Sequence, residues 1–556
     1  MINTQMAYLA ALLLLAAILS AGVQAAVAAE EQTLTMSVGK IGENATDPTF
    51  DRKVCPDTCG TQEYHTYTHW EPLITLDMNA KILPWAAESY GVSDDYRTIT
   101  FHLRKGVKFA DGTPLNASVL KFNFDRIVTI GMKNYKNAYN VLKYYDYSEA
   151  SDEYTFMVHF TEGSLDMPFE LAVYPCFGMF ISPSDISPAW DIKGTLNPGK
   201  MFNGLGPYYM DENESIPNQA IVLKRRHSWR DDYDFRKPKL DKIVLKLIKD
   251  PQVAAMALEN GEIDYICRYW NVPLDSLPSL EENPRITIIT YPETRMYFIR
   301  TAWWKEPFNG TEGILLRKAI SYALERKNMV EGAFNGYALP ATDAVVQSPQ
   351  RPDVPECCGK GYDYDLNKAN QYLAEAGWID TNGDGILDKN GKPLHLDLVC
   401  TSSSTLIWQK DLALIVQSQL KKIGIDIKIR TLEYSEFLQT GRDGTYDLRI
   451  GYNGGGGIPL ANELSLFNLT TGTRNYYEDQ NGTLKTIVEK ARIAADREER
   501  DNSMCQICNI LYDEAGLIPL VYEMQYAVMN SKVKGFKIGP SQTVYCMDHV
   551  EECWIE

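Results

Sequence analysis

Two cysteines and two histidines near the start of the chain have the residue types and the spacing of a metal site. Cys55 and Cys59 are separated by three residues, and so are His65 and His69. Thiolates and imidazoles this close in sequence can enclose a soft or borderline cation. The gap between the two pairs is short for a finger-like site, so we expect a disulfide between the cysteines and keep the metal site as the alternative.

A second possible metal site lies between residues 380 and 391. The ligand positions of a calcium loop would be filled by Asp380, Asn382, Asp384, Ile386 and Asp388. Gly385 supplies the turn glycine of such a loop, but Gly391 stands where the bidentate glutamate belongs. A polar turn without metal is therefore the simpler interpretation, with bound calcium as the alternative. No other cofactor is expected.

Length, composition and charge narrow the class of protein. The 556 residues, of which 45% are hydrophobic, can fill large cores and are too many for one compact domain, so we expect two or three lobes. The net charge of −18, without a block of basic residues, argues against nucleic-acid binding. The chain lacks G-x-S-x-G, H-E-x-x-H and a complete phosphate loop, so we do not expect an enzyme.

The first 29 residues have the pattern of a secretory signal. Residues 6–29 carry no charge, include the apolar run 9–18 and end in small residues. If this segment is not cleaved, it is long enough to anchor the chain in a membrane. We expect an exported or cell-surface protein, and six glycosylation sequons agree weakly with that location: they begin at Asn44, Asn116, Asn213, Asn309, Asn468 and Asn481.

The cysteine count predicts disulfides. Eleven cysteines in an exported chain indicate several bridges and at least one unpaired thiol. We expect the vicinal Cys357 and Cys358 to pair with different partners. Close spacing suggests the local bridges Cys55–Cys59, Cys505–Cys508 and Cys546–Cys553.

The elements that must position these residues alternate between strands and helices. Residues 98–103 alternate apolar and polar side chains as in a half-buried strand, and Asn116 can cap a helix that follows. A further helix is expected over residues 412–420. Further strands are expected over residues 33–38, 155–160, 221–226, 243–248, 286–289, 296–300 and 425–429.

The sequence around the strand at 98–103 resembles that of the solute-binding protein family 5 of ABC importers, the oligopeptide-, dipeptide- and nickel-binding proteins. The resemblance is carried by Trp70–Leu73 (WEPL), Leu83–Tyr90 (LPWAAESY) and Phe101–Pro114 (FHLRKGVKFADGTP). Weaker matches follow in the family's order over residues 203–209, 251–264, 372–378, 446–452 and 517–528.

The resemblance implies an α/β protein with the two-lobe periplasmic-binding-protein fold, type II and cluster C-like. Lobe I would comprise residues 30–72, 200–290 and 515–556, with an extra small subdomain over 73–199. Lobe II would comprise residues 291–514. The strands near residues 286–300 would cross from one lobe to the other.

The resemblance also marks candidate ligand contacts, each of which could instead be ordinary packing. Residues before WEPL line the cleft in the family, and here they are Glu63, Tyr64, His65 and Tyr67. Trp303 and Trp304, beside the hinge, could form an apolar wall. Arg300 and Arg449 would favour an anionic group if they face the cleft.

The loop after residue 451 is a further candidate. Tyr452, Asn453 and Gly455 fall where peptide binders of the family carry cleft residues, and Gly455 replaces the aspartate that pairs with a peptide's amino terminus. The partner for that ammonium group is therefore missing.

The function implied is the extracellular solute-binding subunit of an ABC importer. It would capture a peptide or similar small solute between closing lobes and deliver it to a permease with its ATPase subunits. The alternatives are a nickel or metal-chelate importer subunit and a ligand sensor without transport. We expect a monomer that meets the membrane only through its N-terminal segment.

Overall fold

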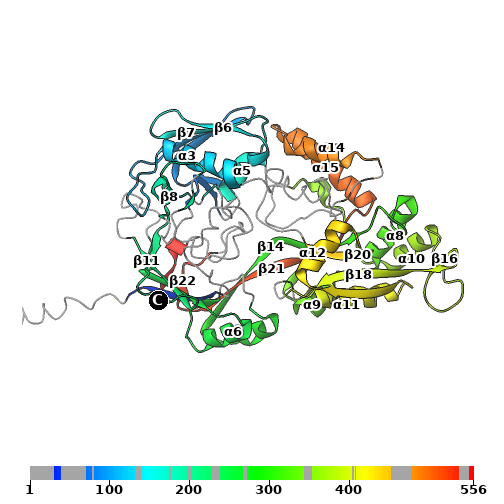
Figure 1. Ribbon diagram of the computed structural model, residues 1–556. Coiled ribbons are helices and arrows are strands. Elements are labelled where there is room, and N and C mark those ends of the chain that lie inside the picture. The colour runs from blue at the N-terminus through cyan, green and yellow to red at the C-terminus, as the bar shows by residue number, and fades with distance from the viewer. Residues whose placement is uncertain are drawn as a thin grey trace, which may run out of the picture.

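A computed structural model of the chain gives the arrangement of its elements (Figure 1). The structure describes residues 31–38, 71–77, 81–131, 140–173, 177–178, 180–193, 195–196, 203–226, 238–266, 272–343, 354–403, 406, 408–452, 477, 479, 481–537 and 550–556. Within them, no helix is long and apolar enough to cross a membrane.

One large mixed sheet runs through both halves of the molecule. Its lobe I strands are β10 (Tyr208–Met210), β11 (Ala220–Arg225), β12 (Lys242–Leu247), β1 (Thr33–Val38) and β13 (Tyr265–Ile266). Its lobe II strands are β20 (Leu448–Tyr452), β18 (His395–Thr401) and β19 (Asp426–Leu432), with β15 (Ala338–Pro340) at the side. The expected strands at 33–38, 221–226, 243–248 and 425–429 are confirmed within one to three residues.

Two long antiparallel strands join the lobes: β14 (Ile286–Thr301) and β21 (Ile518–Asn530). The sequence predicted two short strands, at 286–289 and 296–300. That prediction is wrong, because the structure has the single strand β14 there. The register against β21 shifts between Pro292 and Met296, which interrupts the alternation of side chains without ending the strand. Both strands pass through the centre of the molecule (Figure 1), so the two-lobe fold is confirmed.

A four-stranded antiparallel sheet forms the small subdomain, in the order β4 (Ala87–Val92), β5 (Thr98–Leu103), β7 (Thr155–Phe160) and β6 (Tyr145–Ala150). Helix α3 (Ala117–Arg126) covers it and begins as predicted, because the Asn116 side chain accepts a hydrogen bond from the Val119 amide at 3.0 Å. The short helices α4 (Asn140–Lys143) and α5 (Met167–Val173) complete this unit.

Helices flank both faces of the lobe II sheet. Figure 1 shows α9 (Arg326–Phe334) and α11 (Gln409–Lys421) on one face. On the other face lie α12 (Tyr434–Asp443) and the hairpin of α14 (Leu484–Arg492) and α15 (Arg497–Asp513). The remaining helices are α6 (Pro251–Glu259), α7 (Leu277–Glu281), α8 (Gly310–Ala323) and α10 (Leu366–Glu375).

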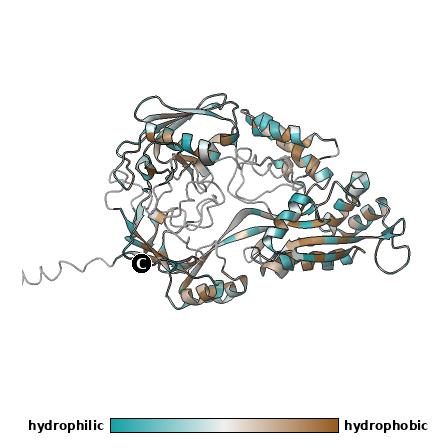
Figure 2. Cartoon of the chain, viewed as in Figure 1, coloured by the Kyte–Doolittle hydropathy of each residue, from teal (hydrophilic) through white to brown (hydrophobic). Residues whose placement is uncertain are grey.

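Buried apolar side chains form one core in the small subdomain, one in lobe I and one on a face of the lobe II sheet. The largest core continues from α6 and α7 of lobe I into lobe II. Figure 2 shows the lobe II strands as largely hydrophobic, with helices that alternate hydrophobic and hydrophilic segments. This is the pattern of a sheet buried on both faces.

Two disulfides tie α15 to the segment before α10. Cys357 pairs with Cys505, and Cys358 pairs with Cys508. The vicinal cysteines therefore have different partners, as expected, but the predicted local bridge between Cys505 and Cys508 is wrong. These two cysteines lie one turn apart on α15, so each can meet one of two consecutive residues opposite. Cys55, Cys59 and Cys546 lie outside the described residues.

Candidate functional site

The carboxyl ends of the lobe II strands point toward lobe I. Strands β18, β19 and β20 are parallel, and β20 pairs in antiparallel fashion with the crossover strand β14. Tyr452, the last residue of β20, lies opposite Tyr297, whereas Leu448 lies opposite Thr301 at the far end of β14. Ligands of open α/β sheets bind beyond the carboxyl ends of the strands, which here is the side of the hinge.

Arg300 and Arg449 meet on the face of this sheet that carries α12. They are direct partners in the ladder between β14 and β20, and each is about 6% exposed. The Arg449 guanidinium lies 3.7 Å from the centroid of the Phe437 ring and donates to the Phe437 carbonyl at 3.2 Å. The Arg300 guanidinium lies 5.1 Å from the centroid of the Phe298 ring.

Burial opposes the positive charge of both arginines. Burial lowers the pKa of Arg300, and burial lowers that of Arg449 to about 10 with a contribution from the neighbouring Arg300 charge. The described part of the chain offers neither guanidinium a carboxylate partner, and the buried Nε of Arg449 has no hydrogen-bond acceptor there. Two like charges in one buried place are costly unless an opposite charge compensates them.

Tyr452 lies at the carboxyl edge of β20 and belongs to a second polar group. Its hydroxyl is 3.3 Å from that of Tyr434, and burial followed by this contact raises the pKa of Tyr452. The Arg295 guanidinium lies 5.7 Å from the centroid of the Tyr452 ring and forms an ion pair with Glu523 at 3.0 Å. The Tyr297 hydroxyl donates to the same Glu523 carboxylate at 3.3 Å. This group links the two crossover strands.

The ion pair between Arg295 and Glu523 was not predicted, although the sequence carries one signal for it. Glu523 interrupts the apolar run of β21. Nearly all the residues of this strand are buried. A lone acidic residue in such a strand needs a partner, and only the fold shows that the partner is Arg295.

Trp303 and Trp304 follow β14 at its lobe II end. Their rings meet edge to face at 5.8 Å, and both are partly buried. Trp303 packs on Tyr477 and Trp304 on Tyr446, the tyrosine whose electrostatic influence reaches both Arg300 and Arg449. A contact between these tryptophans and a ligand stays a prediction.

The other predicted ligand contacts, Glu63, Tyr64, His65, Tyr67, Asn453 and Gly455, lie outside the described residues, as does His69. The structure thus brings together Arg300 with Arg449 and places Tyr452 at the adjacent strand edge.

The 380–391 loop forms a turn that is held by hydrogen bonds from its own side chains. The two Asp380 oxygens accept the Gly383 and Gly385 amides at 2.7 and 2.9 Å. Asp388 accepts the Thr381 amide at 2.9 Å. Among the residues described, no three acidic, histidine or cysteine side chains cluster as a metal site. Calcium binding by this loop stays a prediction.

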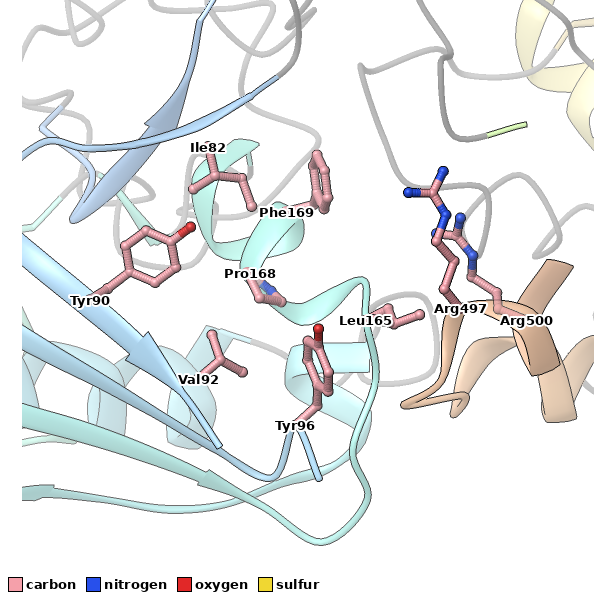
Figure 3. Close-up of a pocket in the computed structure, with 9 residues that line it drawn as sticks. All are labelled: Ile82, Tyr90, Val92, Tyr96, Leu165, Pro168, Phe169, Arg497 and Arg500. Atoms are coloured by element: carbon pink, nitrogen blue, oxygen red, sulfur yellow. The ribbon is translucent and has the colours of Figure 1, made fainter. Parts of the chain in front are cut away.

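A separate cavity of about 400 Å³ lies between the small subdomain and α15 (Figure 3). Its apolar wall comes from the small subdomain, and Arg497 and Arg500 face that wall from α15. The apolar wall comprises Ile82, Tyr90, Val92, Tyr96, Leu165, Pro168 and Phe169. The lobes therefore approach each other at a second place besides the crossover strands.

Two lobes joined by a pair of long crossover strands define the class of two-lobed solute-binding proteins. Comparison with known proteins gives the family. Residues 81–475 match the bacterial extracellular solute-binding proteins, family 5, and the chain belongs to that family. It is a solute-binding subunit of an ABC importer, as the sequence resemblance implied.

Relatives and solved structures extend over most of the chain. The nickel-binding periplasmic protein of Escherichia coli (strain K12) is 28% identical over 85% of this chain and 87% of its own. Oligopeptide-binding protein AppA of Bacillus subtilis is 26% identical over 93% and 91%. The structure of NikA from Brucella suis with Fe(III)-EDTA has a TM-score of 0.78 at 23% identity, covering 95% and 100%. These relatives are substrate-binding transport proteins, not enzymes.

Proposed function

We propose that this importer subunit captures a small anionic solute between its lobes and delivers it unchanged to a permease and its ATPase subunits. The observation that carries the proposal is the buried pair of Arg300 and Arg449, which has no carboxylate partner among the described residues. A guanidinium binds carboxylate or phosphate oxygens through charged, directional hydrogen bonds. Solute binding then favours the closed arrangement, because the contacts from both lobes exist only there.

Two kinds of solute carry such a group. A peptide offers its terminal carboxylate, and the relative AppA from Bacillus subtilis has been solved with a nonapeptide. A metal chelate of a polycarboxylate offers several, and the NikA of Brucella suis has been solved with Fe(III)-EDTA. The resemblance to nickel-binding proteins makes the metal chelate our second candidate.

The test starts with the solute that the protein itself retains. Protein purified under native conditions is denatured, and the released small molecules are identified by mass spectrometry, with metal analysis of the same sample. A peptide without metal supports the first candidate, and a transition metal with an organic acid supports the second. A retained solute without any acidic group contradicts both.

The partner is tested separately. We expect the protein to act as a monomer outside the cytoplasm and to bind a permease in its closed form. Capture of a permease from detergent-solubilised membranes supports transport. Solute binding without any such permease would favour a ligand sensor.

A further inference from the structure

The α14–α15 hairpin of lobe II touches the small subdomain of lobe I. In Figure 1 this hairpin lies beside α5, above the crossover strands that join the lobes. The contact is made by residues more than 300 positions apart in the chain, such as Asn140 and Arg492. It therefore connects the lobes at a place that the hinge itself does not hold.

Arg492 is the centre of this contact. It ends α14, and its side chain is 0% exposed although it is a charged residue. Its Nε donates to the Asn140 side-chain oxygen at 3.2 Å, and its carbonyl accepts the Asn140 side-chain amide at 3.1 Å. Asn140 is equally buried. Such a reciprocal pair forms only when the two lobes meet.

Two ion pairs lie around the contact between Arg492 and Asn140, and each lobe supplies the cation of one pair and the anion of the other. Lys143 of the small subdomain pairs with Glu489 of α14 at 2.5 Å. Arg500 of α15 lies 3.7 Å from Asp166 of the small subdomain, and both are largely buried. The Leu165 amide donates to the Ala494 carbonyl at 3.0 Å. The complementary charges fix one register between the surfaces.

The hairpin is firmly attached to lobe II. Cys505 and Cys508 of α15 are bonded to Cys357 and Cys358. Apolar residues of both helices also pack in the core on the upper face of the lobe II sheet. The hairpin therefore moves with lobe II, so that opening the lobes must break its contacts with lobe I.

We propose that Arg492 and Asn140 are positioning residues of an interlobe latch, which favours the closed arrangement whether or not a solute is bound. The latch is made by side chains of this protein alone, so its strength does not depend on the chemistry of the solute. It would hold a fraction of the empty protein closed and slow the release of a bound solute.

The test uses the full-length protein freed of solute by exhaustive dialysis. Arg492→Ala and Asn140→Ala remove the latch from either side, and Lys490→Ala is the matched control. Lys490 lies on the same helix and pairs with Glu499 of the hairpin at 3.3 Å, so its ion pair lies within lobe II. Circular dichroism establishes that each variant is folded.

Hydrogen exchange at the Leu165 amide is the main readout, because its acceptor belongs to the other lobe. We expect exchange to accelerate about 10- to 100-fold in either latch variant, since charged hydrogen bonds are lost, and to stay unchanged in Lys490→Ala. Small-angle scattering should show larger dimensions for the latch variants. Equal exchange and equal scattering in all proteins would overturn the latch. No solute enters this test, so its failure is separate from failure of the proposed function.

Discussion

Arg300 and Arg449 lie directly opposite each other on antiparallel strands, and both are buried beside aromatic rings. Neither forms an ion pair within the described part of the chain. Their mutual repulsion is a cost that folding alone does not explain. A bound anion would offset this cost, which is the basis of the proposal that the pair binds the solute.

Replacing one arginine should therefore separate binding from stability. In Arg449→Gln, the loss of a charged hydrogen bond of about 1.5–3 kcal/mol should weaken solute binding about 10- to 150-fold. The same change should raise the unfolding free energy of the solute-free protein, because it removes one of two like buried charges. Calorimetric titration and urea denaturation measure the two effects.

The matched control for this variant is Arg97→Gln. Arg97 pairs with Glu162 at 3.0 Å on the surface, and both side chains are about half exposed. Surface pairs contribute little, so both measurements should match wild type. Equal solute affinity in Arg449→Gln and wild type would remove this arginine from the site.

Gly451 gives a steric test of the same site. It lies opposite Phe298 on the strand face that carries the arginine pair, and an added Cβ would come within 2.7 Å of the Phe298 ring. Gly451→Ala should displace that ring, which lies under Arg300. We expect a loss of about 1–3 kcal/mol of stability together with weaker solute binding. Gly91→Ala is the control, because nothing lies within 4 Å of an added Cβ there. Equal unfolding curves for the two variants would show that the ring moves freely.

Glu170 predicts how stability depends on pH. Burial raises the pKa of Glu170 to about 8, even though its carboxylate accepts the Asn140 and Val141 amides at 3.0 and 2.7 Å. A raised carboxyl pKa contributes stability that is complete below the unfolded-state pKa and is lost as the pH rises through about 8.

The melting temperature of wild type should therefore fall from pH 5 to pH 8 more steeply than that of Glu170→Gln. The two proteins differ because the glutamine variant has no carboxyl proton to lose. The corresponding difference in unfolding free energy can reach about 1.4 kcal/mol per pH unit. Thermal denaturation at four pH values measures it. Parallel curves for the two proteins would mean that Glu170 is ionised throughout.

The two disulfides should stabilise the fold non-additively. Their sequence separations are 148 and 150 residues, so either bridge closes nearly the same loop. Replacing Cys358 and Cys508 by alanine should cost little loop entropy while Cys357–Cys505 remains. Replacing all four cysteines should cost about 2–5 kcal/mol. Urea denaturation of the two variants measures the loss of unfolding free energy. If removing the second bridge cost no more than removing the first, the prediction would be contradicted.

The local elements could be predicted where one physical period dominates. The alternation at residues 98–103 identified β5, because one face of that strand is buried and the other is not. Asn116 identified the start of α3, because a cap satisfies amides that the helix leaves open. The irregular middle of β14 was not predicted, because a register shift interrupts the two-residue period while the strand continues.

The site was predicted only in part, because long-range pairing leaves no local pattern. Arg300 and Arg449 could be proposed separately, but the sequence does not contain their register. Spacing misassigned Cys505 and Cys508, whose true partners lie about 150 residues away. Arg492 and Asn140 were missed for the same reason, because they are 352 positions apart in the chain.

The most direct measurement of the central claim is mass spectrometry of the solute released from natively purified protein, repeated after incubation with an excess of that solute. We predict one solute per chain, carrying at least one carboxylate or other acidic group, recovered chemically unchanged. A solute without any acidic group, or one recovered as a different compound, would contradict the account.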